Sequence, residues 1–170
     1  PFFRIIPANM YTAPSHDEII KNLKRTIEIA SRAVSLGRHP FGSLVVGPEG
    51  NIIAEQGNID TVNHAESTIA RTVYTNYPQS YLNRCTLYTS FEPCAMCAGT
   101  CYWAGIGGVV FGATEKRLLE ATGNHEENQT MSLDCRTVFA AGQRQVQVFG
   151  PYPELEDEIV ADHLEFWKSH

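Results

Sequence analysis

The chain has 170 residues, enough for one domain with a sizeable hydrophobic core. Its 43% apolar and 19% charged residues are ordinary for a globular protein, and no apolar run approaches the roughly 18 residues of a membrane-spanning helix. A net charge of −6 without a basic stripe argues against a nucleic-acid or membrane-surface partner and favours a small, uncharged or weakly charged ligand.

We expect an irregular arm over residues 1–15, because this stretch holds three prolines and no hydrophobic periodicity. A single domain is expected to follow over residues 16–170. Its first helix is predicted over His16–Leu36, where apolar residues recur at steps of three and four along one face. Ser15 and Glu18 have the capping-box spacing at the start of this helix.

The rest of the domain alternates short strands with helices. Strands are predicted over residues 41–46, 51–55, 85–90, 108–111 and 145–149, the first two forming a hairpin. Helices are predicted over residues 64–75, 93–104, 114–121 and 153–168, with one or two further helical turns over 136–141. Such alternation indicates an α/β/α layered domain whose sheet is mostly parallel, with one antiparallel pair from the hairpin.

Two connections are singled out. Asn63 is a candidate N-cap for the helix that begins near His64. Residues 122–135 are polar and predict a long loop, a kind of segment that in compact domains is usually functional or mobile. His125 in this loop is expected to be solvated rather than to bind substrate.

The stretch from His64 to Cys97 carries metal-ligand chemistry. One imidazole (His64) and two thiolates (Cys94 and Cys97) suit zinc and leave a fourth tetrahedral position open for water. The two cysteines are three residues apart at a predicted helix start, so their sulfurs share a face where the helix dipole favours thiolates. Glu66 is placed to move protons without binding the metal. The set predicts hydrolytic deamination of an amidine-like carbon with loss of ammonia.

The number of cysteines indicates whether the protein belongs to a reducing or an oxidising compartment. There are five cysteines, an odd number with one Cys-x-x-Cys pair, which suggests metal binding in a reducing compartment rather than a disulfide framework. The first residues have neither a charged leader nor a small-residue cleavage site, so they do not have the pattern of a signal peptide. We therefore expect a cytoplasmic protein.

His-x-Glu at 64–66 and Pro-Cys-x-x-Cys at 93–97 form the pattern of zinc-dependent nucleobase deaminases. The similarity extends to residues 40–42, Asn58, the stretch 88–97 and residues 109–112, and so covers most of the chain. The chain resembles the cytidine-deaminase-like superfamily, on the side that holds bacterial guanine deaminases, fungal-type cytosine deaminases and tRNA adenosine deaminases. The resemblance implies a three-layer α/β/α sandwich around a five-stranded mixed sheet, one zinc ion per chain with a bound water, and a homodimer.

The resemblance also implies substrate contacts. Asn58 matches the asparagine that hydrogen-bonds the base, with a turn asparagine as the structural alternative. The backbone around Ala65 and Glu92 would contact the ring and its amine. Phe41 is as well suited to the core as to a pocket wall, and Trp167 either closes over the ligand or docks the terminal helix.

We predict a free base as the substrate, with guanine first. Tyr102 and Trp103 resemble guanine deaminases, and the acidic balance argues against a tRNA partner. Cytosine, another small aminated heterocycle or a nucleoside comes next, and tRNA adenosine last. The connection between Asn58 and His64 is short and residues 117–136 match no relative, so the base itself stays open.

Two other classes of function are weighed against this one. A zinc-binding scaffold without catalysis would have no use for Glu66. A nucleic-acid-binding module would need the basic stripe that the sequence lacks.

Overall fold

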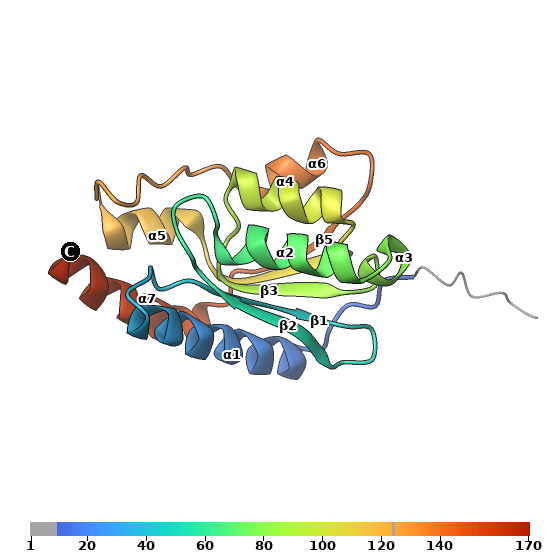
Figure 1. Cartoon of the computed structure of the whole chain (residues 1–170), viewed down its shortest axis with the longest axis horizontal. Helices are drawn as coiled ribbons and strands as arrows, with labels where there is room; N and C mark the ends of the chain where they lie inside the picture. The colour runs from blue at the N-terminus through green and yellow to red at the C-terminus, as the bar shows by residue number, and fades with distance from the viewer. Residues whose placement is uncertain (1–9, 124) are drawn as a thin grey trace, which may run out of the picture.

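The computed structural model describes residues 10–123 and 125–170. A five-stranded mixed sheet lies between two layers of helices, which confirms the predicted three-layer α/β/α fold (Figure 1). The strands are β1 (Gly42–Val46), β2 (Ile52–Gly57), β3 (Thr86–Phe91), β4 (Gly108–Ala113) and β5 (Gln147–Phe149). The helices are α1 (His16–Ser35), α2 (Ala65–Asn76), α3 (Gln79–Leu82), α4 (Ala95–Ala104), α5 (Glu115–Thr122), α6 (Cys135–Ala140) and α7 (Pro153–Ser169).

The sheet has the strand order β2-β1-β3-β4-β5. Strand β1 pairs antiparallel with both β2 and β3, while β3 with β4 and β4 with β5 are parallel. The prediction of a mostly parallel sheet with one antiparallel pair is therefore wrong. The crossover through α2 makes β2 and β3 run the same way, and β1, inserted between them, opposes both. As a result, the carboxyl ends of β2, β3 and β4 meet the amino end of β1 at one edge.

Successive strand residues point to opposite faces of the sheet, and each face has its own hydrophobic core. Val45, Leu87 and Val109 pack under the layer of α2, α3, α4 and α6. Their strand neighbours, such as Leu44 and Val110, face the layer of α1, α5 and α7. Both faces are covered, which explains why all five residues of β1 are buried.

The helix starts follow the predicted capping in part. Ser15 and Glu18 form the predicted capping box, with the Ser15 N–H donating to the Glu18 carboxylate at 2.7 Å. The predicted cap at Asn63 is wrong, because the N-cap of α2 is His64. The Asn63 side chain instead donates to the carboxylate of Asp60 at 2.9 Å, which closes the preceding turn.

Three further points concern the remaining segments. Helix α3 is not among the predicted helices, since a four-residue helix is too short to show a helical period. Residues 1–9 of the predicted arm lie outside the described residues, and 10–15 have no helix or strand. Across the described ranges, no helix is long and apolar enough to cross a membrane.

Candidate active site

A cavity of about 520 Å³ opens at the edge where the strand ends meet. Asn58 directly follows β2, Glu92 directly follows β3, and Glu115 begins the helix after β4. Phe41 precedes β1, which runs in the opposite direction. All four residues line the cavity, because the pairing order of the sheet brings these strand ends together.

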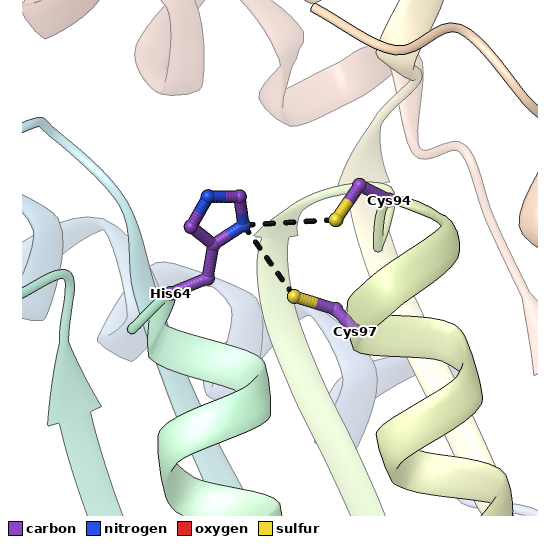
Figure 2. A group of neighbouring side chains, drawn as sticks. All are labelled: His64, Cys94 and Cys97. Carbon is purple, nitrogen blue, oxygen red and sulfur yellow. Dashed lines mark hydrogen bonds between the residues drawn. The ribbon is translucent and has the colours of Figure 1, made fainter. Parts of the chain in front are cut away.

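His64, Cys94 and Cys97 converge beside this cavity from two helix starts (Figure 2). His64 is the N-cap of α2, Cys94 is the N-cap of α4, and Cys97 lies in the first turn of α4. The His64 Nδ1 atom is 3.6 Å from the Cys94 sulfur and 3.5 Å from the Cys97 sulfur.

These separations fit zinc. Bonds of about 2.05 Å to nitrogen and about 2.3 Å to sulfur in a tetrahedron place the two ligand atoms about 3.6 Å apart. The three side chains thus match the donor set and the spacing of a zinc site with one position left for water or substrate. A structural zinc site usually takes four protein ligands, so this arrangement is of the catalytic kind.

Electrostatics in this group favour a thiolate. Hydrogen bonds from the Cys97 thiol and from His64 lower the pKa of Cys94 to about 4. The hydrogen bond to Cys94 in turn raises the pKa of His64 to about 9, although burial opposes the rise. A sulfur held as thiolate at a helix start is the form that binds a metal.

Glu66 lies in the first turn of α2 and is buried against the cysteine pair. Its Oε1 atom accepts a hydrogen bond of 3.0 Å from the Thr89 hydroxyl, and its Oε2 atom lies 3.8 Å from the Cys97 sulfur. Burial raises the pKa of Glu66, which brings the carboxyl closer to neutrality and suits it to accept and release a proton. The sequence analysis did not predict a role for Thr89, because a threonine in a strand gives no sign that its hydroxyl will contact Glu66.

Asn58 and Phe41 form one wall of the cavity. The Asn58 N–H donates to the Phe41 carbonyl at 2.9 Å, so the two residues are fixed to each other across the ends of β1 and β2. The Asn58 side chain is buried and its Nδ2 atom donates to the Asp60 carbonyl at 3.3 Å. The Phe41 ring meets Phe91 edge-on at 6.0 Å.

The remaining predicted contacts fall in different places. Glu92 lines the cavity, whereas Ala65 is fully buried in α2 and is not among the described lining residues. Trp167 is also outside the lining, and packs edge-on against His39, which does line the cavity, at 4.8 Å between ring centroids. His125, expected in solvent, is half-buried with its ring 4.8 Å from that of Trp167.

The cavity wall is rich in carboxylates. Five glutamates line it, and the described lining residues include no lysine or arginine. These glutamates are Glu66, Glu92, Glu115, Glu126 and Glu127. Burial, followed by the negative charge of Cys94 and of Glu66, raises the pKa of Glu115 to about 8. Sequence reasoning missed Glu115, although its place two residues after a parallel strand was a usable signal.

The comparison with known proteins identifies the family. The pattern of the cytidine and deoxycytidylate deaminase zinc-binding region matches residues 17–113, more than half of the chain. The chain belongs to this deaminase family. It is therefore a zinc-dependent deaminase, and His64, Cys94 and Cys97 form a group that could hold the metal ion.

Relatives of this deaminase include enzymes named for different bases. It is 34% identical over 149 residues to the "Probable cytosine deaminase" of Schizosaccharomyces pombe, covering 85% of this chain and 90% of the relative. It is 41% identical over 105 residues to the guanine deaminase of Bacillus subtilis, covering 58% of this chain and 67% of the relative.

A structural neighbour supports the fold. The guanine deaminase from Nitrosomonas europaea superposes with a TM-score of 0.63, covering 95% of this chain and 90% of the neighbour. Its sequence identity is 22%, so this likeness concerns the fold alone.

Proposed function

We propose that this deaminase hydrolyses a free aminated nucleobase, with guanine as the first candidate, and releases ammonia. The carboxylate-rich cavity wall carries the proposal. A nucleotide phosphate would meet the exposed carboxylates of Glu126 and Glu127 there, with no lysine or arginine among the described lining residues to pair with it. Burying an unpaired phosphate is costly, whereas an uncharged base brings no such penalty.

His64, Cys94 and Cys97 are the proposed zinc ligands, and Glu66 is the proposed proton shuttle. Zinc, when bound, would supply an activated water as the nucleophile. Glu66 would take one proton from the water and pass it to the ring nitrogen. It would then take the second proton from the hydroxyl that has added to the carbon and pass it to the departing amine. The carbon–oxygen bond forms and the carbon–nitrogen bond breaks, so the amine leaves as ammonia and a carbonyl remains.

Thr89 and Asn58 have supporting roles in this scheme. The Thr89 hydroxyl holds one oxygen of Glu66, which leaves the other oxygen on the side of the ligand sulfurs. Asn58 is the proposed hydrogen-bond partner of the base, since its side chain is buried at the cavity. The backbone at Ala65 and Glu92 is the proposed contact for the ring and its amine, and Phe41 is the proposed apolar wall.

Cytosine is the second candidate. It is favoured by the relative that matches over 90% of its own length, which is named as a probable cytosine deaminase. Guanine is favoured by the guanine deaminase relative at 41% identity and by the Tyr102-Trp103 pair.

Ammonia release from a panel of compounds tests the proposal. The zinc-loaded protein is assayed with guanine, cytosine, guanosine, deoxycytidine monophosphate and a tRNA anticodon stem. We expect kcat/KM for a free base to exceed that for the monophosphate at least about 100-fold, because an unpaired phosphate costs about 3 kcal/mol or more. If no free base released ammonia, the proposal would fail.

We further infer one domain over residues 16–170, a homodimer and a cytoplasmic location. None of the five cysteines, all within the described residues, is in a disulfide, which supports a reducing compartment. Two large apolar side chains on neighbouring helices support the dimer, since Trp103 is 78% exposed and Tyr74 is 54% exposed.

A further inference from the structure

The Glu92 side chain joins the start of two helices. Glu92 is buried, at 5% exposure, at the end of β3. Its Oε2 atom accepts a hydrogen bond of 3.1 Å from the N–H of Glu115, the first residue of α5. Its Oε1 atom accepts one of 2.9 Å from the N–H of Cys135, the first residue of α6. One carboxylate thereby satisfies unpaired N–H groups of two helices.

Between these two helices lies the wall segment, residues 125–134. Six consecutive residues of this segment line the cavity: Glu126, Glu127, Asn128, Gln129, Thr130 and Met131. The segment follows the far end of α5 and stops just before Cys135. Glu92 therefore binds the residue that directly follows the segment, and also the first residue of the helix that precedes it. A single side chain therefore fixes the carboxyl-terminal end of the wall segment and the start of the helix before it.

Glu92 also lies close to the metal group along the chain. It precedes the proposed ligand Cys94 by two residues, in the turn between β3 and α4. The wall segment is thus tied to the same turn that presents the ligand. Other contacts of the segment are weaker, such as the pair between the half-exposed Glu127 carboxylate and His39 at 3.4 Å.

We propose that Glu92 is a positioning residue that fixes the distance between the wall segment and the metal group, and so controls how tightly the substrate base is held. Hydrogen bonds from backbone N–H groups to a buried carboxylate are among the stronger ones in proteins. Both oxygens are engaged with the backbone, so the side chain acts through the wall rather than by touching the base. The kinetic part of this inference rests on the proposed function, and the structural part does not.

The variant Glu92→Gln tests the inference with little change in size. The amide oxygen keeps one of the two hydrogen bonds, but the amide NH₂ faces the other backbone N–H, donor against donor. We expect faster hydrogen–deuterium exchange in peptides covering 125–135, with zinc content unchanged. For the base that the wild type deaminates, KM should rise about 10-fold while kcat changes less than about 3-fold, because binding is weakened more than chemistry.

Thr114→Ala is the matched control. It removes a side-chain cap from α5, because the Thr114 hydroxyl accepts from the Arg117 N–H at 3.1 Å. Thr114 lies outside the wall segment. This variant should melt at a slightly lower temperature and keep the wild-type KM.

Several outcomes would overturn the inference. Glu92 would have no special role if the Gln variant kept wild-type exchange, or if Thr114→Ala raised KM equally. Loss of zinc from the Gln variant would assign Glu92 to the metal group instead of the wall. If the wild type deaminated no base, the proposed function would fail, while the exchange measurement would still decide the role of Glu92.

Discussion

The carboxyl of Glu66 is confined by its neighbours. The Thr89 hydroxyl and the Cys97 sulfur lie at 3.0 and 3.8 Å from its two oxygens, and burial raises its pKa. A group held in this way loses little entropy when it transfers a proton. The chemistry is therefore expected to depend on this one side chain more than on any residue of the wall.

Replacing Glu66 by Gln should keep one zinc per chain and reduce kcat by about 10²–10⁴-fold, the usual contribution of general acid–base catalysis. Ammonia release and metal content measured on the same sample check this. Thr89→Val is the companion variant. It keeps the Glu66 carboxyl but removes its hydrogen bond to Thr89, so we expect a smaller loss of kcat. Full activity in the Gln variant would rule out Glu66 as the proton shuttle.

At the residue scale, the metal group was predictable and much of the wall was not. Cys94 and Cys97 are linked by helical spacing, and a short motif marks His64, so local sequence is enough. His39 and Glu115 reach the cavity only because of the strand order. The hydrogen bonds of the Glu92 carboxylate span 23 and 43 residues, a separation that no local pattern encodes.

At the element scale, α7 is attached to the segment before β1 through a buried histidine. His163 is fully buried, and its Nε2 atom lies 2.7 Å from the Pro40 carbonyl. The Trp167 indole N–H donates to the Nδ1 atom of His163 at 3.2 Å. Burial lowers the pKa of His163 to about 4, so the ring is neutral, with Nε2–H donating to Pro40. Trp167 packs against His39, and His163 packs against Phe41, so both cavity residues are contacted from α7.

This arrangement predicts a pH dependence of stability. The pKa of His163 is about 4 when folded and about 6.5 when unfolded, so the unfolded chain takes up a proton first as the pH falls. The free energy of unfolding should decrease between pH 6.5 and 4, by about 3 kcal/mol in total from this group. Urea unfolding at several pH values measures it, and His163→Asn should show a flatter dependence. Equal slopes for the two proteins would assign the effect to other groups.

Helix α7 and the hairpin illustrate what element-level patterns reveal. The apolar period of α7 predicts the helix, but not which cavity residue its tryptophan contacts. Alternation of strands and helices predicts the layers, yet it does not reveal that β1 is inserted between β2 and β3. That insertion is a long-range choice of partner, and it decides which loops reach the site.

At the scale of the whole molecule, the exposed side chains of Tyr74 on α2 and Trp103 on α4 support the inferred association of two copies. The inferred dimer buries Trp103, so Trp103→Glu should weaken association by at least about 2 kcal/mol, or about 30-fold in Kd. Sedimentation velocity over a range of concentrations measures this. Leu36→Glu is the control, because Leu36 is 60% exposed at the end of α1, in the other helical layer. A wild type that sediments as a monomer would contradict the dimer.

The carboxylate-lined cavity also affects the end of the reaction. Deamination replaces the exocyclic amine by a carbonyl oxygen, and the neighbouring ring nitrogen gains a proton. The resulting lactam N–H is more acidic than the N–H groups of the starting base. A product that ionises meets the glutamates of the wall, among them Glu126 and Glu127, and is repelled by them. If the proposed free base is the substrate, this repulsion would speed departure of the ionised product.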